Sequence, residues 1–271
     1  MDKEDVYDFL DIASIYDKTG RILEAEFLYQ KIVPHLVDEY IYKKCKKDKT
    51  ACYGPIRDSI ERIGLIRHHI NNLLLNRHLI VEFEIQNDDI IQGYGQLFGK
   101  YLQTNLKEMI LEEPQLSKEH EIKNLFRFFK AVTLKCRQLS FVKICTKPAE
   151  QDADKQHELL QKLVYAFNDK RKVGMKIDFK PDLEKTKMIL SNGYMITLST
   201  GLHIFKKERL RTLSYVTPSL FAIKPKYNQL GQLKFPNLHN FYRAHGGRAT
   251  DYKCYPCAIE VWKIKSFGEV I

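Results

Sequence analysis

The chain has 271 residues, with 44 Lys and Arg against 34 Asp and Glu, a formal net charge of +10. This length allows one large domain or two modest ones, each with a buried core. No apolar run is long enough to span a bilayer, and the acidic start MDKEDVYDFLD is unlike a secretory signal peptide. We therefore expect a cytoplasmic protein.

The six cysteines are scattered along the chain, which predicts reduced thiols instead of a disulfide framework. Cys254 and Cys257 form a lone C-x-x-C pair without the second pair of ligands that a zinc site needs. We expect no metal and no cofactor.

The positive charge is concentrated in the last third of the chain. Residues 170–271 hold 19 Lys and Arg against 7 Asp and Glu, a net charge of +12, whereas residues 1–78 are neutral and residues 79–169 carry −2. Such a bias predicts a polyanionic partner: acidic lipid, nucleic acid or an acidic protein.

The first 78 residues predict three amphipathic helices. Apolar residues from Val6 to Tyr16 recur at helical spacing up to Thr19-Gly20, and a second helix begins near Arg21. Pro34 lies inside the second helix and should kink it. A lysine-rich connector leads to Pro55, which suits the first position of a third helix. Residues 1–78 therefore predict a three-helix bundle.

Residues 79–86 predict a short linker that enters a strand, and residues 87–271 predict an α/β domain with a central mixed sheet. Strand patterns at 107–111, 139–145 and 173–179 alternate with helical patterns at 122–134 and 156–167. A hairpin follows, in which apolar alternation on both sides of Asn192-Gly193 predicts two half-buried strands. A run of basic residues leaves the hairpin: Lys206, Lys207, Arg209 and Arg211.

The bundle resembles an MIT domain. The run Glu24-Ala25-x-x-x-Tyr29-Gln30 matches the EAxxxYQ motif of that family's second helix. The resemblance implies that C-terminal helices of ESCRT-III subunits bind in the groove between helices 2 and 3. Here the groove would be lined by Ile56, Ile60, Glu61 and Arg67.

Two residues depart from the MIT pattern. Gly64 takes the place of the acidic residue that pairs with an arginine of the bound helix, and Ser59 takes the place of an aromatic residue. Glu61 and Asp58 are the candidates to replace the missing carboxylate, and the departures put peptide specificity in question.

The rest of the chain resembles the phospholipase-D-like C-terminal domain of the MIT-domain-containing protein 1 family. Matching segments occur in the same order, with residues 221–253 as an insertion without a counterpart: Glu113-Pro114, Asn124–Phe128, Asn192–Tyr194, Gly201–Lys207 and Ala258–Trp262.

Phospholipase D enzymes use a His-x-Lys-x-x-x-x-Asp motif, in which histidine attacks phosphorus and lysine stabilises the phosphoryl charge. By alignment these positions fall on Glu184, Thr186 and Ser191, and no histidine of the chain is followed two places later by lysine. The resemblance therefore implies a phospholipase-D-like fold that is not an enzyme. Because the chain holds one half of a two-motif site, it also implies a homodimer.

The leading hypothesis is a non-enzymatic ESCRT-III adaptor. Its dimeric basic domain would bind acidic, phosphoinositide-containing membrane through Lys206, Lys207, Arg209 and Arg211. The resemblance places it peripherally on endosomal membrane and the midbody, where it would serve abscission at the end of cytokinesis.

Two alternatives stay open. The first is a phosphodiesterase with a rearranged site in the insertion, built from His239, His245 and Lys253. The second is a nucleic-acid-binding module, although no nucleic acid is expected under the leading hypothesis. It would use aromatic residues that lie among Lys and Arg: Tyr227, Phe235, Phe241, Tyr242 and Tyr252.

Overall fold

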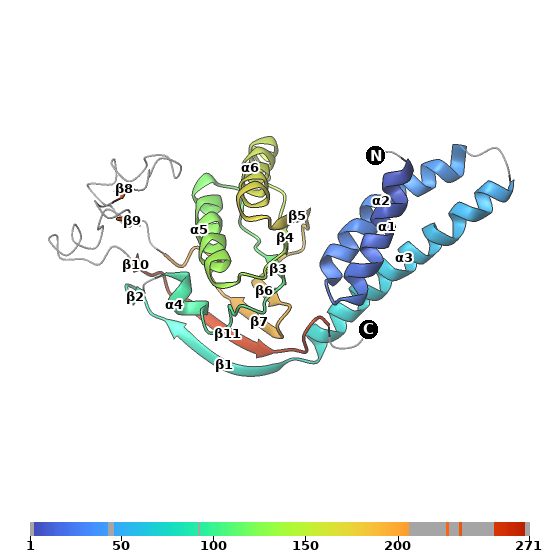
Figure 1. The fold of residues 1–271 in the computed structure, drawn as a ribbon. Coiled ribbons are helices and arrows are strands. Elements are labelled where there is room, and N and C mark those ends of the chain that lie inside the picture. The colour runs from blue at the N-terminus through green and yellow to red at the C-terminus, as the bar shows by residue number, and fades with distance from the viewer. Residues whose placement is uncertain are drawn as a thin grey trace.

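The computed structural model describes residues 3–42, 46–91, 93–205, 226–227, 233–234 and 252–268. Its N-terminal part is a bundle of three helices, as the sequence predicts: α1 (Lys3–Lys18), α2 (Ile22–Tyr42) and α3 (Lys46–Leu75). Figure 1 shows the three helices side by side, at one end of the molecule.

The predicted start of the third helix is wrong. Helix α3 begins at Lys46, and Pro55 lies inside it, as Pro34 lies inside α2. Lysine is a good helix former, so the lysine-rich segment before Pro55 extends the helix instead of connecting two of them. The proline ring removes only one backbone donor, and a helix of this length tolerates that loss.

The C-terminal part contains a mixed seven-stranded sheet with the strand order β1-β11-β7-β6-β3-β4-β5. Strands β3, β4 and β5 run parallel to one another, and the remaining neighbours are antiparallel. The mixed α/β architecture predicted from the sequence is confirmed. The strands are β1 (His78–Ile85), β3 (Glu108–Glu112), β4 (Phe141–Thr146), β5 (Gly174–Phe179), β6 (Thr186–Leu190), β7 (Tyr194–Leu198) and β11 (Cys257–Lys263).

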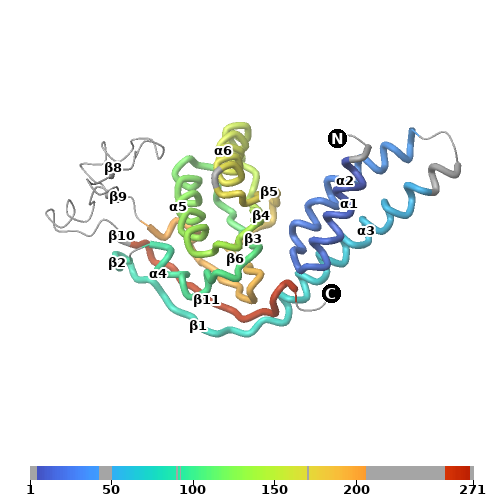
Figure 2. Tube along the Cα trace, in the orientation of Figure 1, coloured from blue at the N-terminus to red at the C-terminus, as the bar shows by residue number. Residues whose placement is uncertain are grey.

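Helix α3 continues almost directly into the sheet. Strand β1 begins at His78, so residues 79–85 of the predicted linker and entry segment are strand, and Figure 2 follows this path from α3 into β1. In its described residues, the sheet domain also contains three helices and four short strands: α4 (Tyr94–Phe98), α5 (Glu119–Lys135), α6 (Ala153–Arg171), β2 (Ile90–Ile91), β8 (Lys226–Tyr227), β9 (Leu233–Lys234) and β10 (Tyr252–Lys253).

The central strands of the sheet are covered on both faces. Helices α5 and α6 lie over one face (Figure 1), where Met109 and Leu111 of β3 join their core. Ile110 points to the opposite face and packs in the core of the helical bundle, because neighbouring residues of a strand point to opposite sides. The bundle therefore forms the third layer of the molecule.

This third layer corrects the prediction of half-buried hairpin strands. Ile189 of β6 is 2% exposed and Met195 of β7 is 3% exposed, although both point away from α5 and α6. The side chains that alternate with them, Met188 and Ile196, are fully buried beneath those helices. Both faces of the hairpin are buried because the bundle covers the second one.

A carboxylate of the sheet caps the first turn of α2. Glu108, at the start of β3, accepts hydrogen bonds from the backbone N–H groups of Leu23 at 3.2 Å and Glu24 at 3.0 Å. The Glu24 carboxylate in turn accepts a hydrogen bond of 2.9 Å from Ser140. Helix N-termini expose such donors, which a side-chain oxygen can accept, so this contact fixes the bundle on the sheet.

Candidate functional site

The surface between α2 and α3 carries an apolar stripe. Ile60 is 54% exposed and Ile56 is half-buried, whereas Ile63 and Ile66 on the same helix face the bundle core. The structure thus separates two isoleucine stripes on α3, as the sequence suggested. An exposed isoleucine beside a helix–helix groove is the kind of contact point that an amphipathic helix uses.

Gly64 leaves a gap along this stripe. A Cβ placed on it would meet no atom within 4 Å, among the described residues. The position at which the resemblance predicts an acidic residue is therefore open, while Glu61, a proposed substitute, is exposed on the same helix.

The surface on which the α2–α3 groove is predicted also carries a cluster of charged residues, to which both domains contribute. The Glu26 carboxylate on α2 pairs with Arg67 of α3 at 2.8 Å and with Lys143 of β4 at 2.8 Å. Gln30 also donates to Glu26 at 2.9 Å and is itself hydrogen-bonded by Lys176 of β5. The predicted groove residue Arg67 is thus already paired, although its side chain remains 59% exposed.

The Glu26 carboxylate is held in its charged form. Burial alone would raise its pKa, but the two cations Lys143 and Arg67 outweigh that effect and the pKa lies below its ordinary value. Because one of these cations belongs to the sheet, the charge state of the groove depends on how the two domains are docked.

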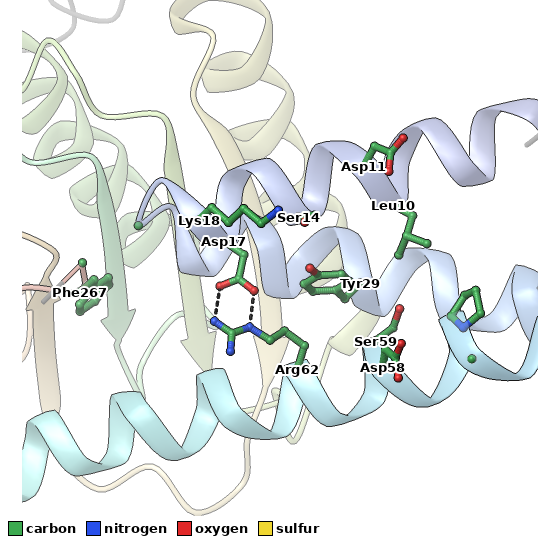
Figure 3. A pocket seen from close by; sticks show the side chains of 14 residues that line it. Leu10, Asp11, Ser14, Asp17, Lys18, Tyr29, Asp58, Ser59, Arg62 and Phe267 are labelled. Atoms are coloured by element: carbon green, nitrogen blue, oxygen red, sulfur yellow. Dashed lines mark hydrogen bonds and ion pairs between the residues drawn. The ribbon is translucent and has the colours of Figure 1, made fainter. Parts of the chain in front are cut away.

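A second hollow, which sequence reasoning missed, lies between α1 and α3. This cleft has a volume of about 860 Å³ and includes Asp17 and Arg62, which form the ion pair drawn in Figure 3. Ser59 lines the cleft as well. Its hydroxyl is buried and has no hydrogen-bond partner among the described residues. The sequence did contain an indication of this cleft. Gly54 and Ser59 are small, and larger side chains at these two positions would fill part of the space.

The three positions aligned with the phospholipase D motif do not converge. Thr186 begins β6 and is buried, and its hydroxyl donates to the Glu113 carboxylate at 3.1 Å. Ser191 lies beyond the other end of β6, where its hydroxyl accepts the backbone N–H groups of Lys107 at 3.1 Å and Glu108 at 3.0 Å. Glu184 is exposed. Thr186 and Ser191 therefore make structural hydrogen bonds.

Glu113, which accepts the hydrogen bond from Thr186, is buried. It also accepts the backbone N–H of Leu202 at 2.8 Å, and burial raises its pKa to about 7. Gly201 adjoins it closely, since a Cβ there would lie 3.0 Å from a Glu113 oxygen. The Glu113 carboxyl group, the Thr186 hydroxyl and the Leu202 backbone N–H therefore form one hydrogen-bonded cluster.

Several predicted residues lie outside the described part of the chain. These are the membrane-binding candidates Lys206, Lys207, Arg209 and Arg211, together with His239, His245, Phe235, Phe241 and Tyr242. Tyr227, Tyr252 and Lys253 fall in short strands, of which only the backbone is described. Among the described helices, none is both long and apolar enough to cross a membrane.

Comparison with known proteins agrees with this architecture. Residues 92–221 match a family described as the phospholipase D-like domain at the C-terminus of MIT. The chain is also similar to MIT domain-containing protein 1 of Mus musculus, with 22% identity over 197 residues that cover 72% of this chain and 78% of the relative.

Proposed function

We propose, from the match of residues 92–221 to the family described as the phospholipase D-like domain at the C-terminus of MIT, that the chain is a non-enzymatic adaptor. In this proposal the helical bundle binds the C-terminal helices of ESCRT-III subunits. The basic sheet domain binds acidic membrane as a homodimer. The adaptor would act at endosomal membrane and at the midbody, during abscission at the end of cytokinesis.

One observation carries the peptide-binding half. Ile60 lies 54% exposed on the α2–α3 surface, between half-buried apolar residues and the charged cluster at Glu26. An amphipathic helix would bury its anchors against Ile56 and Ile60 and place polar groups near Arg67 and Lys143. Lone exposed apolar residues are common on protein surfaces, so this assignment needs a matched test.

The chain offers such a matched pair of residues on α3. Ile60→Asp places a charge in the proposed groove, whereas Leu65→Asp places one at a second exposed apolar position, 45% exposed and on another side of the helix. The full chain would be titrated with ESCRT-III tail peptides by calorimetry. We expect Ile60→Asp to remove binding, because an unpaired carboxylate in an apolar contact costs roughly 2–5 kcal/mol.

Leu65→Asp should bind like the wild type, and both variants should keep the wild-type unfolding temperature because both positions are exposed. Equal binding by the wild type and Ile60→Asp would show that the groove is elsewhere, and the α1–α3 cleft would be the next surface to test.

The membrane-binding half is supported by the net charge of +12 in residues 170–271. Each basic side chain near an anionic surface contributes about 1 kcal/mol, and the attraction decays within a Debye length. Removing Lys206, Lys207, Arg209 and Arg211 together should therefore weaken binding to phosphatidylserine vesicles by roughly 3–4 kcal/mol per chain. Flotation at rising salt tests this, and equal binding to neutral vesicles would contradict it.

The non-enzymatic part is supported by the roles of Thr186 and Ser191. Both hydroxyls are used in hydrogen bonds that hold secondary structure together. They also sit at opposite ends of β6. A phosphoryl group could not contact both of them at once.

A further inference from the structure

A small pocket lies between α5 and the segment after β7. Its volume is about 240 Å³, below the roughly 300–1,000 Å³ of common small-molecule sites. It therefore suits a compact ligand. Its lining combines two imidazoles, two permanent cations, an amide and two aromatic rings: His120, Lys123, Asn124, Arg127, His203, Phe205 and Tyr255.

The lining is suited to an anion. Among the described residues that form the pocket there is no carboxylate. Two acidic residues of α5 adjoin the lining. Glu119 forms an exposed pair of 2.6 Å with Lys123, which Lys123 would give up to contact a bound anion. Glu121 lies 4.0 Å from His120 and accepts the backbone N–H groups of Ser117 and Lys118, each at 2.8 Å. Among the described residues, Arg127 makes one long hydrogen bond of 3.4 Å, to Asn124, so its guanidinium keeps donors for a ligand.

His203 supplies an independent indication of a missing partner. Its Nε2 lies 3.3 Å from the carbonyl oxygen of Gln115, whereas its Nδ1 is shielded from solvent and has no hydrogen-bond partner among the described residues. Shielded polar atoms in folded proteins are nearly always paired. Since the Gln115 carbonyl can only accept, Nε2 carries a proton. Nδ1 is covered in this arrangement, so it would donate to a ligand after the imidazole ring turns toward the pocket.

We propose that this pocket binds a phosphate monoester, with Arg127 and Lys123 contacting the phosphate oxygens and His203 donating from Nδ1. A dianionic group matches two permanent cations and two titratable imidazoles, whose ring centroids lie 6.1 Å apart. Arginine and lysine both bind phosphate, arginine often through two hydrogen bonds.

Binding should be coupled to protonation of His203. Burial lowers the pKa of His203, and the charges of His120 and Lys118 lower it further, against the opposing effects of Glu121 and the Gln115 carbonyl. These surroundings favour neutral imidazole, which cannot donate from both nitrogens. A bound anion stabilises the doubly protonated ring, so affinity should rise as the pH falls.

The ligand could be a phosphorylated lipid headgroup or a free phosphate compound. The lipid source rests on the proposed membrane-binding function, because it places this pocket at the membrane surface. Binding of a free phosphate compound does not require membrane binding. Experiments can therefore contradict the phosphate pocket and the membrane-binding function independently.

The first experiment titrates the full chain with inorganic phosphate at constant ionic strength. Arg127→Gln should weaken binding by about tenfold or more, as expected for loss of a charge-assisted hydrogen bond. Arg137→Gln is the matched control, since Arg137 is exposed just beyond α5 and outside the pocket. No binding by the wild type, or equal losses in the two variants, would overturn the proposal.

The second experiment repeats the titration with sulfate, which stays dianionic, between about pH 5.5 and pH 8. Wild-type affinity should fall as the pH rises, and His203→Gln should flatten this dependence while His120→Gln retains part of it. An unchanged pH profile in His203→Gln would overturn the assigned role of His203.

A third measurement separates the two sources. Phosphatidylcholine vesicles that contain a phosphatidylinositol monophosphate are compared with phosphatidylserine vesicles of the same surface charge. Arg127→Gln should lose the preference for the phosphoinositide and keep binding to phosphatidylserine. If phosphate binds but neither vesicle does, the pocket stands and the membrane function fails. If both vesicles bind equally and phosphate does not bind, the membrane function stands and the pocket fails.

Discussion

The ammonium group of Lys143 on β4 lies 2.8 Å from a carboxylate oxygen of Glu26 on α2. Glu26 is 2% exposed and Lys143 is 13% exposed at their side chains, and Arg67 of α3 completes the cluster. The charged cluster beside the proposed α2–α3 binding surface is therefore built from both domains. A helix bound to that surface, as proposed, would contact the sheet domain as well as the bundle.

Lys143→Met should destabilise the full chain. The substitution leaves the buried Glu26 carboxylate with Arg67 as its remaining charged partner, and breaking a buried ion pair from one side costs roughly 3–5 kcal/mol. Because Arg67 stays, we expect about 3 kcal/mol, measured by urea denaturation. Lys162→Met is the control, since Lys162 and Glu158 form an exposed pair on α6. A wild-type denaturation midpoint for Lys143→Met would show that the two domains dock without this contact.

Glu108 should make stability depend on pH. Burial raises the pKa of Glu108 from 4.5 to about 8, against the lowering effect of its hydrogen bonds from Glu24 and Leu23. The folded state then holds a proton that the unfolded state has lost, so unfolding free energy should fall as the pH rises from about 4.5 to about 8.

Glu108→Gln has no proton to lose, and its unfolding free energy should fall less over the same window. Denaturation of both proteins between about pH 5 and pH 8.5 measures the difference. Glu113 has the same sign of shift, with a pKa of about 7, so part of the slope should remain in the variant. Parallel curves for the two proteins would contradict the assignment to Glu108.

The sequence predicted the elements well where periodicity is local. The strong helical pattern at 122–134 and the strand pattern at 173–179 correspond to α5 and β5. The sequence did not predict the burial of side chains that are covered by a segment distant in the chain. The alternating pattern of β6 and β7 does not reveal that Ile189 and Met195 are covered by the bundle, which comes from more than 100 residues earlier in the chain.

The candidate sites show the same limit. Ile60 could be assigned from helical spacing, since Ile63 and Ile66 define the core side of the same helix. The proposed anion pocket could not, because His203 and Arg127 are far apart in sequence and line one pocket only through the fold, which brings the segment after β7 to α5. The sequence contained the residue types but not their juxtaposition.

Thr186 should be needed for stability and not for catalysis. Thr186→Val keeps the side-chain shape and removes the hydroxyl that donates to the buried Glu113 carboxylate. The loss should be about 1–3 kcal/mol, as for a buried acceptor deprived of a donor. Thr104→Val, at an exposed loop position, should change stability little. Neither the wild type nor Thr186→Val should hydrolyse phosphodiesters, and hydrolysis that survives purification and disappears with Thr186 would contradict the structural role.

Gly201→Ala should destabilise the region around Glu113, whereas Gly64→Ala should stabilise α3. Gly201 has φ +81°, and a Cβ there would lie 3.0 Å and 3.2 Å from the two Glu113 oxygens. The positive φ and the close contact each disfavour alanine, with a combined cost of about 1–3 kcal/mol.

Gly64 is the matched control, because it lies inside a helix and a Cβ there would meet no described atom within 4 Å. Alanine at an exposed helical glycine gains about 0.5–1 kcal/mol. Thermal and urea denaturation of the two variants should therefore shift in opposite directions. A Gly201→Ala protein as stable as the wild type would mean that Glu113 and Leu202 can separate at little cost, and that the backbone donor of Leu202 does not fix the segment leading to the anion pocket.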